Sequence, residues 1–177
     1  EAGSRAVGII CLIGFLMGVI IAFETALVAQ IFGAVIFVVN GIGIAMTREL
    51  GPLMTAILFA GRSGSAFAAQ LGTQKVNEEL NALTTFGLSP MYFLVVPRLI
   101  ASSLVVPLLS VFATILGILG GGLVMAMYDI TYTQFYVQLL KSVTVTDIVF
   151  GLVKAVIFGF VIALIGCQCG MNTGAGG

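Results

Sequence analysis

Long runs of apolar residues, interrupted by few charges, dominate the pattern along this chain. Residues 6–23 carry no charge, and after Glu24 a second uncharged run extends over residues 25–47. A bilayer core about 30 Å thick takes about 20 helical residues to cross, so these runs predict two membrane-spanning helices. We place the turn between them near Gln30 and Gly33, which puts Glu24 near the far end of the first span.

The second apolar run does not end there. It continues past Arg48 and Glu49 and through a Gly51-Pro52 pair to about residue 71. This length is too great for one straight crossing of the bilayer. Because proline lacks a backbone N–H and bends helices, either the helix is interrupted at Gly51-Pro52 or it extends beyond the membrane.

Two further runs predict a third and a fourth span. Residues 99–128 form the longest uncharged run, and residues 148–170 carry no charge except Lys154 near their start. The intervening residues 129–147 mix aromatic side chains with Lys141, which predicts a loop with an interfacial helix. The fold class is therefore an all-α integral membrane protein with about four transmembrane helices.

One segment, residues 72–90, differs from the rest because charges crowd into it. The charged residues lie within five positions of one another: Lys75, Glu78 and Glu79. The apolar residues recur at helical spacing: Val76, Leu80 and Leu83. The segment predicts a short amphipathic helix on the cytoplasmic face that ends at Gly87. Such a helix is either a solvated connector or a docking helix that a soluble partner holds and moves.

The composition is that of a chain surrounded by lipid. Sixty per cent of the residues are hydrophobic and 8% are charged, whereas about a quarter of a soluble domain is charged. Seven basic and seven acidic residues cancel, so there is no electrostatic case for a nucleic-acid partner.

The positive-inside rule favours Arg5, Lys75 and Arg98 on the cytoplasmic side and Lys141 outside. Residues 1–177 form one domain.

Arg48 and Glu49 are adjacent charges within hydrophobic sequence. At the centre of a membrane helix each costs about 2.5–3.5 kcal/mol on insertion scales, so both should face protein or water. They are either part of an ion-pair network that sets helix packing or the lining of a cavity for a substrate with charged and apolar parts. Arg62 lies 14 residues after Arg48, on a similar face if the helix continues. It either contacts an anionic headgroup or extends to the interface.

Three glycine pairs have the spacing that lets helices approach closely, which predicts tight bundle or dimer packing. The pairs are Gly14–Gly18, Gly117–Gly121 and Gly166–Gly170.

Enzyme chemistry is not indicated. Gly61-Arg62-Ser63-Gly64 matches a serine-protease string, but the chain has no histidine to act as the base. Cys167 and Cys169 alone are weak evidence for a metal. The chain lacks a phosphate-binding loop, so ATP-driven transport would need another chain to hydrolyse ATP. We therefore predict no catalytic residue, metal or cofactor.

The run over residues 47–97 closely resembles the MlaE (YrbE-type) permeases, the membrane subunits of ABC systems that move phospholipids between the inner and outer membranes. Three pieces carry the resemblance: Arg48-Glu49-Leu50-Gly51-Pro52, the run from Ala60 to Ala66, and the segment 72–90. Members of this family usually begin with an interfacial helix and continue into a fifth span. The resemblance thus implies that both are missing from this chain.

The resemblance also implies a multi-pass protein of the bacterial inner membrane and a set of partners. These are a second copy of the permease, two ATP-binding ABC subunits, a cytoplasmic STAS-domain protein, and a periplasmic ring of MCE-domain proteins. The 72–90 helix would be the coupling helix that docks in the ATPase. Arg48 and Glu49 would lie beside the lipid cavity, with Arg62 and with Glu24, where the family often has glutamine.

Two other interpretations remain open at this point. The chain is a stand-alone channel or ion-coupled secondary transporter that uses Glu24, Arg48, Glu49 and Lys154 as an ion path. Alternatively, it is a membrane scaffold with no transport of its own.

Overall fold

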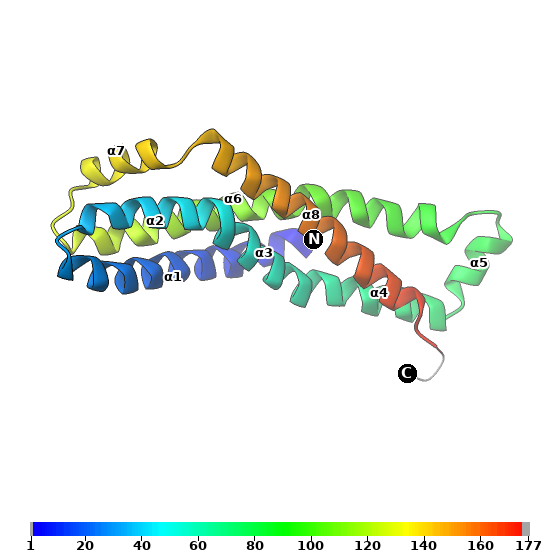
Figure 1. Ribbon diagram of the computed structural model, residues 1–177. Helices are drawn as coiled ribbons and strands as arrows, with labels where there is room; N and C mark the ends of the chain where they lie inside the picture. The colour runs from blue at the N-terminus through cyan, green and yellow to red at the C-terminus, as the bar shows by residue number, and fades with distance from the viewer. Residues whose placement is uncertain (1, 175–177) are drawn as a thin grey trace.

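The computed structural model describes residues 2–174, with side chains from residue 7, so the predicted position of the Arg5 side chain lies outside the described part. The described residues are almost all helical and contain no strand. Four segments are long and apolar enough to cross a membrane: Val7–Ile31, Val35–Val76, Met91–Ala126 and Val145–Met171. The predicted all-α membrane fold is confirmed. Figure 1 shows the helices bundled along one long axis.

The helices follow one another with short connections. In chain order they are α1 (Ala2–Ile31), the 3₁₀ turn η1 (Val35–Phe37), α2 (Val38–Ile44), the π-helical turn η2 (Ala45–Leu50), α3 (Gly51–Phe59), the π-helical turn η3 (Ala60–Gly64), α4 (Ser65–Val76), α5 (Glu79–Thr85), the π-helical turn η4 (Met91–Val95), α6 (Val96–Ala126), α7 (Tyr132–Ser142) and α8 (Val145–Met171). The first predicted turn is confirmed, since α1 ends at Ile31 and Gly33 has a φ of 64°.

The second segment is one continuous helical path of 42 residues, about 63 Å long at 1.5 Å per residue. Of the two alternatives at Gly51-Pro52, the interruption is not observed, because the helical path continues through the pair. The π-helical turn η2 explains how the path passes the proline, because the Gly51 N–H bonds the Met46 carbonyl five residues back. The register thus changes just before the residue that has no N–H to donate.

The helices of the bundle differ in how far they extend along its long axis. α1 packs against α6, α6 against α8, and α4 against α8. In Figure 1 the N-terminus lies midway along the molecule, while α4 and parts of α6 and α8 continue toward α5 at one end. α7 lies at the opposite end. The two short helices therefore mark the two ends of the bundle.

The glycine pairs are used within this one chain. A Cβ on Gly18 would overlap the Gly117 backbone where α1 meets α6. A Cβ on Gly166 would lie 2.7 Å from the Gly64 carbonyl oxygen, and one on Gly170 would lie 2.7 Å from that of Ala68. Since no side chain separates these helices, the predicted close packing is packing of the bundle itself.

The amphipathic segment differs from the prediction of a single helix over residues 72–90. Its first residues continue α4, and the chain turns at Asn77 and at Glu78, which has a φ of 59°. α5 begins only at Glu79. The turn allows Leu80 to fold back and become buried.

The predicted end of this helix at Gly87 is confirmed. Gly87 has a φ of 74°, its N–H bonds the Thr84 carbonyl, and the Leu88 N–H bonds the Leu83 carbonyl, both at 3.0 Å. This is the Schellman arrangement, which requires the left-handed conformation that glycine adopts readily.

The predicted interfacial helix is α7, and α8 begins three residues earlier than expected, at Val145. Each helix starts with a capping box: Thr131 with Gln134 for α7, and Thr144 with Asp147 for α8. Gln138 donates to the Asn40 side-chain oxygen at 2.8 Å, which ties α7 to α2.

Candidate functional site

Four charged side chains and one aromatic ring meet where η2 crosses the start of α8. Lys154 Nζ lies 2.6 Å from Glu49 Oε1, and Arg48 Nη1 lies 3.4 Å from Asp147 Oδ1. Arg48 Nε is also 3.9 Å from Glu49 Oε1. The guanidinium carbon of Arg48 lies 5.3 Å from the centre of the Phe150 ring, a distance typical of a cation–π contact. We call these five residues the charged network.

Local helix geometry brings the five residues together. Asp147, Phe150 and Lys154 follow one another at intervals of three and four, which places them on one face of α8. Gly151, one residue after Phe150, allows α8 to lie directly against η2, because a Cβ there would overlap the Thr47 carbonyl oxygen. The network thus depends on the close approach of two helices about 100 residues apart in sequence.

Hydrogen bonds hold the two charged residues that α8 contributes to the network, Asp147 and Lys154. The Thr144 hydroxyl and backbone N–H donate to Asp147 Oδ2 at 2.7 and 3.0 Å, which leaves Oδ1 for Arg48. Lys154 also donates to the Arg48 carbonyl at 3.4 Å. One ammonium group therefore contacts both the Glu49 carboxylate and the Arg48 carbonyl.

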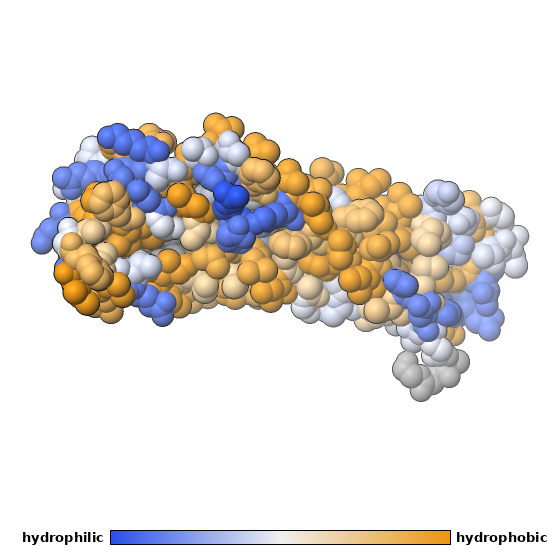
Figure 2. Space-filling model, in the orientation of Figure 1, coloured by the Kyte–Doolittle hydropathy of each residue, from blue (hydrophilic) through white to orange (hydrophobic). Residues whose placement is uncertain are grey.

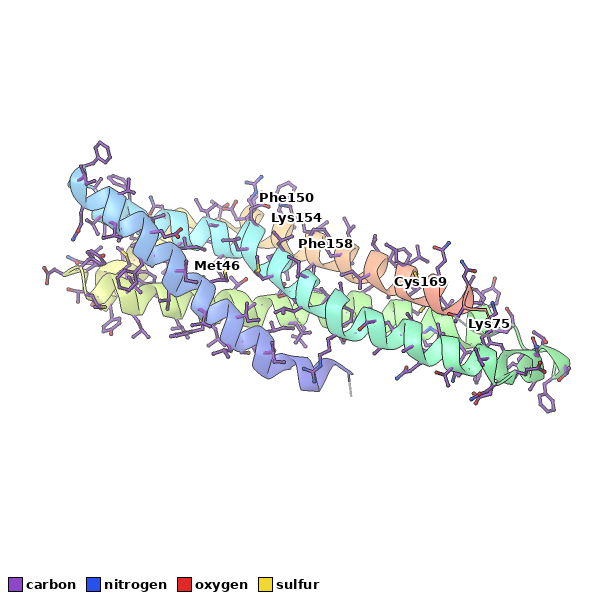
Figure 3. The ribbon with its side chains drawn as sticks, turned by 90° about the horizontal axis from the view of Figure 1, so that it is seen from below. Met46, Lys75, Phe150, Lys154, Phe158 and Cys169 are labelled. Carbon is purple, nitrogen blue, oxygen red and sulfur yellow. The ribbon has the colours of Figure 1, made fainter. Side chains whose placement is uncertain are left out.

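The network is open to its surroundings on one side. The side chains of Glu49, Arg48 and Lys154 are 58%, 46% and 36% exposed, whereas Asp147 is 12% exposed. Figure 2 shows a hydrophilic cluster among apolar atoms near the place where α8 passes η2, and Figure 3 shows Lys154 and Phe150 on the same stretch of α8. Exposed charges are costly in acyl chains, so this face is suited to water, protein or a polar headgroup.

An apolar pocket of about 290 Å³ lies beside the network, on another face of α8. It lies between α6, α7 and α8 and is lined by Thr47, Ser110, Val111, Thr114, Ile115, Ile118, Leu139, Leu140, Val143, Ile148, Gly151 and Leu152. The Thr114 hydroxyl donates to the Met46 carbonyl at 3.2 Å, so it is satisfied within the protein. Chemically, the pocket suits hydrocarbon.

The structure divides the four residues predicted to line a lipid cavity. Arg48 and Glu49 meet in the network. Glu24 is exposed on α1 and takes no part in the network that the described residues form. Arg62 lies in η3 and lines a separate groove beside the start of α1.

Sequence reasoning missed the two partners of Arg48 on α8 and did not pair Lys154 with Glu49. Asp147 entered only as the end of a loop, and Lys154 only as a charge near the start of the fourth span and as part of an ion path. One signal for Asp147 was available, since a threonine followed three residues later by an acidic residue before an apolar run is a helix-start pattern. No local pattern indicates which distant charge Asp147 meets.

The residues predicted to couple to an ATPase also differ in their roles. Leu80 is buried, so this one residue of the apolar stripe faces the bundle. Lys75 donates to the Met171 carbonyl at the end of α8, as Figure 3 shows by its place beside that end. Glu78 and Glu79 are exposed, as is Val76, and Leu83 is partly buried. Phe86 is 80% exposed at the end of α5 and was not predicted.

Comparison with known proteins decides the family. The family model described as Permease MlaE matches residues 1–177, the whole chain. The chain belongs to the MlaE permease family. As an MlaE permease it is a membrane subunit of the ABC transporter class, which works with an ATP-binding partner. This favours an ABC permease over a stand-alone ion-coupled transporter.

Relatives of this MlaE permease include probable ABC transporter permease proteins. The one from Rickettsia typhi is 32% identical over 98% of this chain and 68% of the relative. That from Synechocystis is 34% identical over 98% of this chain and 66% of the relative. The chain thus spans about two thirds of their length. The chloroplastic protein TRIGALACTOSYLDIACYLGLYCEROL 1 of Arabidopsis thaliana is 37% identical over 76% of this chain and 39% of its own length.

Proposed function

We propose that this MlaE permease moves phospholipids through the membrane and that the charged network holds the lipid headgroup. The observation that carries the proposal is the placement of four interacting charges on a face otherwise surrounded by apolar side chains. A phospholipid combines a charged headgroup with hydrocarbon. Its phosphate can accept hydrogen bonds from Arg48 and Lys154, and the pocket beside the network suits part of an acyl chain. The name of the Arabidopsis relative contains that of a lipid, trigalactosyldiacylglycerol, which agrees with a lipid substrate.

The fold supports a mechanical link between the proposed headgroup site and an ATPase. The helical path from η2 continues without a break to the end of α4, 28 residues after Arg48 and about 42 Å away. At that end Lys75 binds the end of α8, and at η2 Glu49 binds Lys154 of α8. The helical path from η2 to α4 is therefore joined to α8 both at its cytoplasmic end and at the proposed headgroup site. A partner that displaces the α5 end would change the alignment of α4 and α8 and strain the Glu49–Lys154 pair.

In this proposal the ATPase contacts the exposed surface of α5, which includes Glu78, Glu79 and Phe86. The permease supplies no catalytic residue, and the ATP-binding subunit hydrolyses ATP. The working unit is a homodimer in the bacterial inner membrane, with a STAS-domain protein on the cytoplasmic side and MCE-domain proteins outside. In a dimer the exposed charges of the network would face a shared interior rather than lipid.

The test is purification of the whole assembly followed by reconstitution. Mass spectrometry of the assembly should identify an ATP-binding subunit and bound phospholipid. Transfer of a fluorescent phospholipid between liposomes should require ATP and should fall in Arg48→Gln, with Arg98→Gln on α6 as a matched arginine control. Ion-driven flux in liposomes that hold this chain alone would instead support a secondary transporter. If Arg48→Gln impairs assembly but never transfer by assembled complexes, the network is structural only.

A further inference from the structure

A group of exposed apolar side chains lies at the start of the third long helical segment, away from the charged network and its pocket. Met91, Tyr92 and Phe93 of η4 are 52%, 77% and 60% exposed. Their neighbour Val95 is buried, so η4 turns one face toward the bundle and another away from it. We call the three exposed residues the η4 surface.

The packing of Val95 gives the level of this surface along the bundle. Val95 belongs to a buried cluster with Leu71 of α4 and Cys167 of α8. Met171, the last residue of α8, packs against the same cluster, and its carbonyl accepts a hydrogen bond from Lys75. Figure 3 shows Lys75 at that end of α8. The η4 surface lies just before Val95 in the chain and is therefore level with the end of α8.

The length of α8 relates this level to the bilayer. α8 has 27 residues, which makes it about 40 Å long. A hydrocarbon core of about 30 Å centred on α8 therefore leaves about 5 Å of helix at each end. Polar residues flank the helix as this placement requires, Thr144 before it and Asn172 after it. Cys167 lies one turn inside the end of α8, so the cluster around Val95 marks the edge of the core and the η4 surface lies just outside it.

The orientation of Arg98 supports the same level. Arg98 follows Val95 on the core side, and its Nη1 donates to the Leu94 carbonyl at 2.9 Å. The guanidinium group is therefore directed back along the helix toward η4. Arginine side chains near the ends of membrane helices direct their charge toward the nearer interface. This contact thus indicates an interface at about the level of η4.

The chemistry of the η4 surface suits the boundary between lipid and water. Residues 80–97 carry no charge, whereas Lys75, Glu78 and Glu79 precede them. Tyr92 combines an apolar ring with a hydroxyl group, and tyrosine is enriched at the level of lipid headgroups. The surface also continues without a break into the apolar helix α6. Together these features favour a lipid surface as its occupant.

We infer that the η4 surface is a membrane anchor, in which Tyr92 and Phe93 insert between headgroups and acyl chains of the leaflet on the α5 side. Phe86 at the end of α5 lies on the other side of the turn at Gly87 and does not enter the bilayer. The anchor holds α5 at a fixed depth beside the membrane. The inference goes beyond lipid transport and does not depend on it.

The chain contains no tryptophan, which permits a direct test. Tyr92→Trp, Phe93→Trp and Phe86→Trp each introduce a single fluorescent probe into the full chain. Each variant is reconstituted in nanodiscs of phosphatidylcholine that carries bromine either near the glycerol or near the chain end. Emission from Tyr92→Trp and Phe93→Trp should fall most with bromine near the glycerol. Emission from Phe86→Trp should fall with aqueous iodide and change little with either brominated lipid.

Leu104→Trp is the matched control for depth. Leu104 is 69% exposed on α6, and it lies about 18 Å beyond Tyr92 along the helix, near the middle of the bilayer. Its emission should fall most with bromine near the chain end. Only variants that elute like the parent in size exclusion are compared.

A photo-crosslinking measurement distinguishes lipid from protein in the whole assembly. Benzoylphenylalanine in place of Tyr92 should crosslink to phospholipid, as identified by mass spectrometry. Crosslinking from this position to a protein subunit instead would mean that a partner covers the η4 surface, and the anchor would be excluded.

The fluorescence measurements can also overturn the inference. It is wrong if emission from Tyr92→Trp and Phe93→Trp responds to iodide but not to the brominated lipids. It is equally wrong if their emission falls most with bromine near the chain end, since both residues would then lie within the core. A response of Phe86→Trp to brominated lipid as strong as that of Tyr92→Trp would contradict the separation of η4 from α5.

Discussion

The Lys154 ammonium lies 2.6 Å from the Glu49 carboxylate, although the two residues are 105 positions apart in the chain. The pair joins the start of α8 to the last residues of the π-helical turn η2. Through its second contact, Lys154 also donates to the Arg48 carbonyl at 3.4 Å. A single side chain on α8 therefore supports both the charge balance and the backbone of the proposed headgroup site.

Exchanging the two charges tests this pair. Glu49→Lys and Lys154→Glu alone should each lower ATP-driven phospholipid transfer roughly tenfold, because each places two like charges together in apolar surroundings. The double exchange should recover much of the loss. Lys141→Glu on α7 is the control, since Lys141 is exposed and outside the network. A double variant no better than either single one would show that the pair itself is not required.

Removing the Thr144 cap should affect both stability and transport. Thr144→Ala should destabilise the start of α8 by about 0.5–2 kcal/mol, the range for loss of an N-cap side chain. It should also lower transfer, because Asp147 loses the hydroxyl hydrogen bond that helps to orient it toward Arg48 and keeps only the bond from the backbone N–H of residue 144. Thr131→Ala removes the equivalent cap of α7 and should cost similar stability without the loss of transfer. Denaturant unfolding and the liposome assay measure the two effects, and equal transfer in both variants would contradict this prediction.

The contact of Gly18 with Gly117 should be intolerant of any side chain. Gly18→Ala should destabilise the bundle by about 1–3 kcal/mol, since the added methyl group overlaps the α6 backbone. Gly8→Ala on the same helix has open space around it and should be neutral or stabilising by up to about 1 kcal/mol. Thermal unfolding in detergent compares the two variants. Equal melting temperatures would mean that α1 and α6 do not approach as closely as described.

The two faces of α5 should respond differently to substitution. Phe86→Ala and Glu79→Lys should weaken association with the ATP-binding subunit about tenfold, because both residues are exposed and an aromatic anchor contributes strongly to an interface. Leu80→Ala should instead lower the stability of the permease by about 2–5 kcal/mol, as truncation of a buried leucine does. Thr85→Ala is the control, since its hydroxyl bonds the Ala82 carbonyl of the same helix. Unchanged association in both surface variants would place the docking surface elsewhere.

Labelling from the two sides of the membrane tests the orientation. With Cys11, Cys167 and Cys169 replaced by alanine, Asn81→Cys on α5 should react only from the cytoplasmic side and Thr133→Cys on α7 only from outside. The expectation follows from their positions at opposite ends of the bundle and from the bias of basic residues. Reaction of Asn81→Cys from outside would exclude a cytoplasmic ATPase as the partner of α5.

The amino-acid sequence by itself determined the features that depend on local chain properties. The number of spans follows from the length of the uncharged runs compared with the thickness of a bilayer. The end of α5 follows from Gly87, whose left-handed conformation few other residues adopt. The resemblance around Arg48 and Arg62 likewise indicated the family before any geometry was known.

Only the tertiary structure decided which distant residues meet. The helical path continues past Pro52 because the π-helical turn η2 precedes it, and Lys154 of α8 donates to the Arg48 carbonyl in that turn. Leu80 faces the bundle because the chain turns at Glu78. Arg48 contacts Asp147 of α8, whereas Arg62 lies beside the start of α1, so the two arginines do not share a site. The physical reason is that an apolar run acts through its own length, whereas a contact across about 100 residues depends on how closely two helices approach. That approach depends on glycines such as Gly151, and no local sequence pattern indicates which distant backbone each glycine packs against.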